Sequence, residues 1–311
     1  MKRMFCTLWT VLLFVACTHK ELCYDHAHSV DLTVVFDWGQ APDAKPESMS
    51  LYLFPKDGSK SLRYEFVGRE GGTVVVPAGR YDALCLNSDT DKIFLRSVDR
   101  FETFEIATRE TALWESLGVR PSAIPRAEGA EEEPVVASPD RVWYACGRDL
   151  DLNLEAGAHA IVLSPGDALC TIDCTIVDAE NLKYVSALSA SLSGMAGGLL
   201  PGRDEPTGEL VTFPFAATSD GEGTVTGSLL CFGHCPHTDA THKLTVYAVL
   251  ADGSKWYYTY DVSAQMHADI GDQRHISIEL EKLPLPEPIV DGGGFQPDID
   301  EWRPVDVELP M

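Results

Sequence analysis

The sequence has few basic residues and only a short apolar run. Its 311 residues include 24 lysines and arginines against 48 aspartates and glutamates, a formal net charge of −24 at pH 7. A surface this acidic repels phosphate backbones, which argues against nucleic-acid binding. The apolar run at residues 4–16 is shorter than the ~20 residues that a membrane-spanning helix needs.

Several signatures of catalysis are also absent. The sequence contains no G-x-S-x-G, no H-E-x-x-H, no phosphate-binding loop and no Rossmann glycine pattern. The glycine-rich stretch "SGMAGG" at 193–198 is not followed by a phosphate-cradling helix start, which favours a turn between strands. The acidic tail lacks the ligands and the glycine of a helix–loop–helix calcium site. The sequence therefore predicts a protein that is not an enzyme and needs no cofactor.

The N-terminus carries a targeting pattern. A basic start, "MKR", precedes the apolar run, and Ala16 and Cys17 end it, as in a secretory signal peptide. The end of the run resembles a bacterial lipobox, in which the cysteine is lipidated and becomes the new N-terminus, although Phe14 stands where leucine is usual. Because stable anchoring takes more than one acyl chain, the resemblance implies several on Cys17, palmitate among them, and retention at the outer membrane, exposed at the cell surface. The alternative is an ordinary secretory peptide cut elsewhere, with Cys17 incidental.

Cysteine is frequent, with nine residues in the chain. Once Cys6 leaves with the signal peptide and Cys17 carries lipid, seven remain, an odd number that cannot all pair. Cys170 and Cys174 lie on the strand-like stretch "ALCTIDCTIV". Four residues of strand span ~13 Å, whereas a disulfide needs Cα atoms within ~7 Å. We therefore expect these two thiols to be buried and not bonded to each other.

One stretch, "CFGHCPHTDATH", resembles a metal site. Zinc sites commonly place a cysteine pair before a histidine pair. Gly233 and Pro236 mark a turn here, so the pattern favours a hairpin loop, and no metal is predicted. The candidate ligands, should a metal bind, are Cys231, Cys235, His237 and His242.

The rest of the chain consists of short alternating runs separated by turn residues. Examples are "VDLTVVFDW" at 30–38 and the hairpin "VLADGSKWY", in which Asp-Gly forms the turn. Such spacing predicts β-sandwiches, and one helical pattern occurs at 108–118. The predicted organisation is a signal peptide at 1–16, a tether at 17–29, a β-sandwich at 30–118, an acidic proline-rich linker or loop at 119–140, a second β-sandwich at 141–283 and an extended tail at 284–311.

The tail ends in a strand pattern, "VDVEL". Val305, Val307 and Leu309 point one way, and the acids between them point the other. Because an exposed strand of this kind is a liability unless it is paired, we expect it to pair with a sheet edge. That edge is either its own or a partner's, and the glycines of "VDGGGFQP" supply the slack for both.

Together with Cys17, five stretches carry a family resemblance: "FDW" at 36–38, "SLYLFP" at 50–55, "PAGRYDALCLNSDT" at 77–90, "SLSGMAGGLLP" at 191–201 and the tail at 283–302. They resemble fimbrillin-like surface lipoproteins of Bacteroides-type bacteria, which belong to type V pili, and within these a poorly characterised anchor and accessory group. The resemblance implies an all-β fold of two tandem transthyretin-like Greek-key β-sandwiches with one short helix. It also implies assembly with other fimbrial subunits by strand pairing.

One departure from the family pattern bears on function. In stalk subunits a trypsin-like protease cuts after an arginine behind the first strand, and a neighbour's strand fills the groove that opens. Here the loop "GQAPDAKPES" contains Lys45 and no arginine, and Arg63 lies inside a predicted strand. The sequence therefore favours a non-catalytic fimbrial anchor or accessory subunit. The alternative is a glycan- or host-binding adhesin that does not polymerise.

Overall fold

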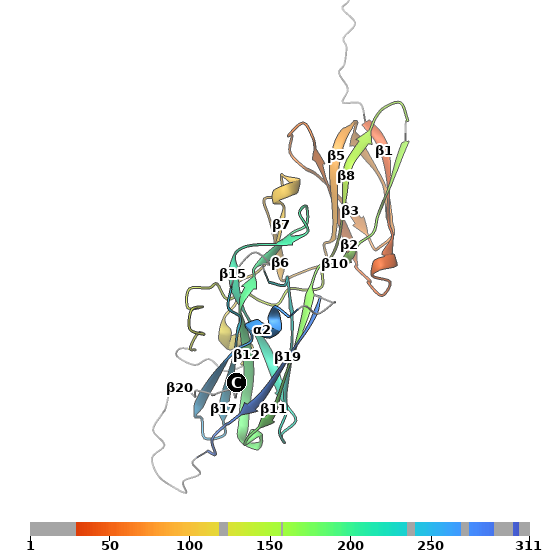
Figure 1. Cartoon of the computed structure of the whole chain (residues 1–311). Coiled ribbons are helices and arrows are strands. Elements are labelled where there is room, and N and C mark those ends of the chain that lie inside the picture. Colours follow the sequence, from red (N-terminus) through yellow and green to blue (C-terminus); the bar gives the residue numbers. More distant parts are fainter. Residues whose placement is uncertain are drawn as a thin grey trace, which may run out of the picture.

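The structure, a computed structural model, describes residues 29–117, 124–156, 158–234, 240–268, 274–288 and 301–304. Two β-sandwiches are stacked end to end in Figure 1, with β1 in the upper one and β11 in the lower one. In the described ranges the helices are single turns, and none is long or apolar enough to cross a membrane. The all-β prediction is confirmed. The helical turns are η1 (Trp38–Gln40), η2 (Phe101–Thr103), η3 (Leu113–Glu115), η4 (Leu182–Tyr184) and α2 (Ser263–Met266).

The N-terminal sandwich packs a three-stranded sheet against a five-stranded one. β1 alternates strictly, so Leu32 and its even-numbered neighbours are buried while Thr33 and the other odd-numbered residues are exposed. Burial of that alternating face against the other sheet forms the N-terminal core. The first sheet, in spatial order, is β4 (Gly71–Pro77), β1 (Ser29–Phe36) and β9 (Ala158–Leu163). The second is β10 (Gly166–Asp167), β8 (Trp143–Leu152), β5 (Gly79–Asn87), β2 (Ser48–Pro55) and β3 (Leu62–Val67).

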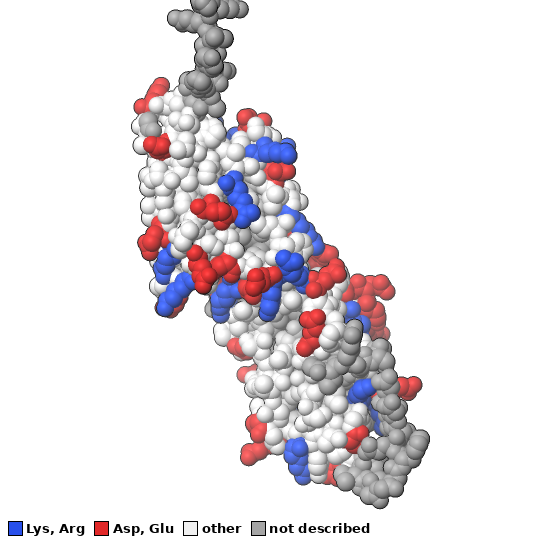
Figure 2. All heavy atoms as spheres, turned by 180° about the vertical axis from the view of Figure 1, so that it is seen from behind, with Lys and Arg blue, Asp and Glu red and all other residues white. Residues whose placement is uncertain are grey.

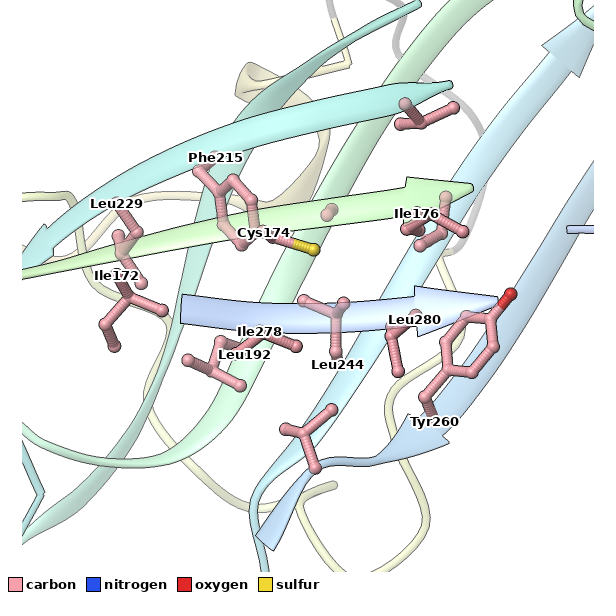
Figure 3. Packing of buried hydrophobic residues seen from close by; sticks show 14 of the residues in the cluster. Ile172, Cys174, Ile176, Leu192, Phe215, Leu229, Leu244, Tyr260, Ile278 and Leu280 are labelled. Atoms are coloured by element: carbon pink, nitrogen blue, oxygen red, sulfur yellow. The ribbon is translucent and has the colours of Figure 1, made fainter. Parts of the chain in front are cut away.

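The C-terminal sandwich is one eight-stranded sheet that folds around its own core. Alternate residues of β11, among them Ile172, Cys174 and Ile176, point into this core together with Phe215 and Ile278 from other strands (Figure 3). In spatial order its strands are β19 (His275–Leu283), β11 (Cys170–Ala179), β16 (Val225–Cys231), β15 (Leu210–Ser219), β12 (Val185–Ala196), β17 (Lys243–Leu250), β18 (Lys255–Asp261) and β20 (Trp302–Pro304).

A small third sheet joins the two sandwiches. It is built from β6 (Ile93–Arg96), β7 (Glu105–Thr108), β13 (Gly198–Leu200) and β14 (Glu205–Pro206), so it draws on both halves of the chain. Beneath it lies an aromatic core in which the ring centroids of Tyr52 and Phe104 are 4.9 Å apart and those of Phe54 and Phe101 are 5.5 Å apart. Because this core contains residues of both sandwiches, the junction is a packed interface rather than a free hinge.

The domain boundary differs from the prediction. β8 and β9 follow the segment 119–140, yet β8 pairs with β5 and β9 pairs in parallel with β1. The N-terminal sandwich therefore extends to β10, and the second does not begin at 141. The described part of 119–140 is an excursion onto the C-terminal sandwich, where the Val136 amide donates to the Thr212 carbonyl at 3.0 Å. Alternation reveals that a strand exists, but the open edges of β5 and β1 that accept β8 and β9 are not visible in local sequence.

The predicted helix at 108–118 is also wrong. Thr108 ends β7, and only η3 forms a helical turn in the described part of that segment. The Thr108 hydroxyl donates to the carbonyl of Ala137 at 2.6 Å, so the side chain expected to cap a helix instead ties β7 to the excursion. Backbone hydrogen bonds from Arg109 to the Lys92 carbonyl and from Thr111 to the Val135 carbonyl hold the start of this segment to neighbouring chain, and they outweigh the weak local helical pattern.

Acidic and basic side chains are interspersed on the face seen in Figure 2, with many lysines and arginines on the N-terminal sandwich and near the junction. Ion pairs account for part of this, including Lys56 with Asp82 at 2.7 Å and Arg148 with Glu102 at 2.8 Å. Exposed pairs such as Arg148–Glu102 contribute little stability, whereas the Asp82 carboxylate is buried.

Candidate pairing strands and a histidine cluster

β1, the first strand in the described part of the chain, is held on both sides. Along most of its length it pairs antiparallel with β4 and parallel with β9. β4 approaches β1 so closely that a Cβ on Gly71 would lie 2.1 Å from the Val34 carbonyl oxygen, and its φ of +94° also requires glycine. The deeply buried side chains on β1 are Val30, Leu32, Val34 and Phe36. Removing β1 would therefore open an apolar groove between β4 and β9.

The loop behind β1 is fastened to the sandwich. The indole of Trp38 is buried and donates to the Arg69 carbonyl at 2.8 Å, while the Arg69 guanidinium donates to the Ala44 carbonyl at 2.6 Å. Lys45, the loop's single basic residue, is exposed, and the following Pro46 is buried. Arg63 lies within β3, as predicted.

The C-terminal segment begins on the edge of its own sheet. β20 runs parallel to the start of β18, with Trp302 opposite Lys255 and Pro304 opposite Tyr257. The Trp302 ring packs against Tyr247 with a centroid separation of 5.5 Å. The predicted pairing residues Val305, Val307 and Leu309 lie outside the described residues, so their partner stays a prediction.

Cys17, the predicted lipidation site, also lies outside the described residues. The structure describes the chain from Ser29 onward, where β1 begins. Lipidation and the tether therefore remain predictions.

The expectation for Cys170 and Cys174 is confirmed, because both are buried and neither forms a disulfide. Burial raises the pKa of the Cys174 thiol to about 12, which keeps it protonated at neutral pH. Cys231 faces Cys170 across the β11–β16 pair and is fully buried. A hydrogen bond with Cys170, together with burial, raises the pKa of Cys231 well above its ordinary value. The Cys231 thiol thus belongs to the core.

Of the remaining candidate metal ligands, Cys235 and His237 lie outside the described residues. His242 is fully buried at the start of β17, and two further histidines surround it: His234, from the loop after β16, and His267, from the end of α2. Burial and the neighbouring His234 lower the pKa of His242 to about 4, so its ring is neutral at physiological pH. Sequence reasoning missed His267 because nothing in its surroundings resembles a ligand motif.

A surface cavity of about 460 Å³ lies where the excursion meets the junction sheet, with Arg96 and Glu209 in its wall. The Arg96 guanidinium is 3.2 Å from Glu209 and 3.3 Å from Glu105. Arg96 is thus paired with both carboxylates, and the cavity suggests no chemistry.

The chain is similar in sequence to a fimbrial protein of Bacteroides. It is 26% identical over 190 residues to the "Putative fimbrium anchoring subunit Fim4B" of Bacteroides ovatus. That stretch is 61% of this chain and 52% of the relative, so the chain spans about half the length of the protein it matches.

Two solved structures share the fold. A "putative adhesin" from Bacteroides ovatus superimposes with a TM-score of 0.62 at 18% identity, covering 84% of this chain and 94% of that one. The fimbrial anchor protein Mfa2 from Porphyromonas gingivalis gives a TM-score of 0.50 at 14% identity, covering 82% and 91%. A family profile described as a domain of unknown function, DUF5119, matches residues 16–216. With most of its length inside that match, the chain belongs to the DUF5119 family.

Proposed function

We propose that this protein is a non-catalytic cell-surface lipoprotein that anchors a fimbrium, or serves it as an accessory subunit, at the outer membrane. Three findings support the proposal: the relative named as a fimbrium anchoring subunit, the fold shared with a fimbrial anchor protein, and the position of β1. The position of β1 carries the argument, because it places the strand that follows the tether in the middle of a sheet.

The tether limits how far the fold can lie from the membrane. From Cys17 to Ser29 there are 12 residues, and an extended chain spans at most ~3.3–3.6 Å per residue, or ~40 Å in total. With lipid on Cys17, the N-terminal sandwich would stay near the membrane surface, and the C-terminal sandwich would be the half available to a fimbrium.

An anchor of this design must keep its loop behind β1 intact. Since Cys17 precedes β1, a cut in that loop would leave the lipid attached only to β1, with the rest of the protein held by noncovalent contacts. The loop offers trypsin-like proteases only Lys45, and Pro46 at the next position blocks cleavage by such enzymes. The buried Trp38 fastens the loop to the sandwich, which further restricts a protease's access to the loop. These features favour an anchoring role over that of a polymerising stalk subunit.

The C-terminal segment is the proposed contact with a neighbouring subunit. Val305, Val307 and Leu309 continue from β20, and in the described residues the outer edge of β18 beyond Tyr257 has no strand paired with it. Strand addition gives affinity through backbone hydrogen bonds, and alternating apolar residues fill pockets. We propose that this segment pairs along a sheet edge in the assembled fimbrium. We also propose that both sandwiches have a transthyretin-like strand arrangement.

The test is a deletion of the gene in the source bacterium, complemented with the wild type, with Cys17→Ala or with Cys146→Ala. Cys146 is an exposed cysteine on β8, so its substitution is the matched control. Fimbriae should be shed into the medium by the deletion strain and by Cys17→Ala, and should return to the cells with the wild type and with Cys146→Ala. Fimbriae that remain attached in the deletion strain would refute the anchoring role. A positive glycan array with the purified chain, in that case, would support the adhesin alternative.

A further inference from the structure

Three histidines from separate segments converge at one end of the C-terminal sandwich. His234 follows β16, His242 precedes β17, and His267 follows α2, which lies at the end nearer the N-terminal sandwich (Figure 1). Their nearest ring nitrogens all lie within 4.8 Å of one another. The ring centroids of His234 and His242 are 5.3 Å apart, those of His234 and His267 are 5.0 Å apart, and those of His242 and His267 are 4.9 Å apart.

These separations are close to those of a tetrahedral metal site. With Zn–N bonds of ~2.0–2.1 Å, two ligand nitrogens lie ~3.3 Å apart and two imidazole centroids ~5.2 Å apart. The Nε2 atoms of His242 and His267 are 3.1 Å apart. The three ring planes are inclined to one another by 60–74°, so the rings converge by their edges and do not stack. The ligand nitrogens are spread over up to 4.8 Å, so binding an ion would draw the widest-spaced pair together by about 1–1.5 Å through rotations of the rings.

The surrounding backbone holds His242 in the orientation that ligation requires. Its Nδ1 lies 3.4 Å from the carbonyl oxygen of Ser193, so Nδ1–H faces an acceptor and Nε2 is left to face His267. Metal-binding histidines characteristically use the second ring nitrogen in this way. Gly194, in the β12 bulge, makes room for the ring, because a Cβ there would lie 3.0 Å from His242 Nδ1.

The other two segments are also fastened. The His242 amide donates to the hydroxyl of Ser263, the first residue of α2, at 2.9 Å, and the His267 amide donates to the Ser263 carbonyl at 3.0 Å. The Ala196 amide donates to the Gly233 carbonyl at 3.0 Å, which ties the chain beside His234 to β12. These hydrogen bonds hold the segments that carry the three histidines in place.

We propose that His234, His242 and His267 form a binding site for a divalent transition-metal ion, with Zn²⁺ as the best fit. Imidazole suits Zn²⁺, Cu²⁺ and Ni²⁺ and is a poor ligand for Mg²⁺ and Ca²⁺, which prefer oxygen. The net charge of −24 raises the local concentration of cations around the protein. His267 is exposed, so the fourth coordination position of the ion would open toward solvent. The ion would tie the loop after β16, the start of β17 and α2 into one unit at this end of the sandwich.

The experiment titrates Zn²⁺ and Co²⁺ into the full chain, purified without a histidine tag and stripped of metal with a chelator. Calorimetry gives the stoichiometry and affinity, and Co²⁺ absorption in the visible range reports tetrahedral coordination. His267→Gln is the primary variant because this side chain is exposed and its loss leaves the fold intact. His242→Gln tests the buried ligand. His159→Gln, at a half-buried histidine on β9 in the other sandwich, is the matched control.

We expect one Zn²⁺ per chain in the wild type and in His159→Gln, a tetrahedral Co²⁺ spectrum, and an affinity at least tenfold weaker in His267→Gln. Added Zn²⁺ should raise the melting temperature of the wild type and leave that of His267→Gln unchanged. Absence of stoichiometric binding by the wild type would overturn the proposal. Equal affinity in the wild type, His267→Gln and His242→Gln would also overturn it, because the ion would then be bound elsewhere.

Discussion

Substitution of Leu32 by alanine tests whether β1 is an integral part of the N-terminal core. Leu32 is fully buried at the middle of β1, in register with Val74 of β4 and His159 of β9. Leu→Ala substitutions in well-packed cores destabilise by about 2.7–5.0 kcal/mol, from lost transfer free energy and the remaining cavity. At roughly 2–4 °C per kcal/mol for a unit of this size, the melting temperature of the N-terminal sandwich should fall by about 5–20 °C.

The neighbouring residue supplies the control. Thr33 is exposed on the opposite face of β1, and its hydroxyl lies 3.2 Å from that of Thr73. Thr33→Ala removes one surface hydrogen bond and should cost less than ~1 kcal/mol. Differential scanning calorimetry of the full chain compares the two variants with the wild type. Equal shifts for Leu32→Ala and Thr33→Ala would refute the assignment of β1's inner face to the core, and with it the argument that loss of β1 opens an apolar groove.

Three further predictions follow from single sites. Gly194→Ala should lower the melting temperature more than Gly129→Ala: both positions have positive φ, but a Cβ at 194 would lie 2.6 Å from the Thr241 carbonyl oxygen, whereas nothing lies within 4 Å at 129. Thiol reagents should label Cys146, slowly because burial raises the pKa of its thiol to about 12, and should leave the buried Cys174 unlabelled until the protein is unfolded; rapid labelling of Cys174 in the native state would contradict its inward orientation. Asp220 accepts hydrogen bonds from three backbone amides, which lower its pKa to about 2, so its stabilising effect is complete above the unfolded pKa of ~3.9 and is lost as the pH falls through ~2. Asp220→Ala should therefore melt below the wild type at pH 7 and at the same temperature near pH 2, and a difference independent of pH would exclude this role for the carboxylate.

The strands that the sequence predicted correctly are those with a strict alternation and a clear burial contrast. β1 and β11 each bury every second residue, and Cys170 and Cys174 lie on the buried face of β11 as predicted. In β18, Tyr258 and Tyr260 are buried on one face, and Tyr257 lies on the opposite face near Tyr247. In these cases the local pattern is sufficient, because a one-residue shift would expose an entire apolar face.

The sequence does not show which segments far apart in the chain contact one another in the fold. The Glu133 carboxylate, inside the segment interpreted as a linker, accepts from the Thr212 hydroxyl at 2.7 Å and from the Gly194 amide at 3.1 Å. An acidic proline-rich stretch predicts exposure, and only the folded C-terminal sandwich supplies these donors. The histidine cluster has the same origin. His234 and His242 are close in sequence, whereas His267 reaches them because β17 and β18 form a hairpin that returns the chain to the same end.

The placement of β1 has a mechanical consequence in the proposed anchoring role. Tension between a lipid on Cys17 and a fimbrium would enter the fold at Ser29 and act along β1. Hydrogen bonds to β4 and to β9 lie across that direction on both sides of the strand, so they would be loaded together rather than one after another. At the far end of β1, the Asp37 amide donates to the Leu163 carbonyl at 2.8 Å, which couples the strand's exit to β9. The load would then pass through the aromatic junction core to the C-terminal sandwich, since that core contains residues of both. A first strand at a sheet edge would instead peel off one bond at a time, so a central position is the arrangement that resists tension best.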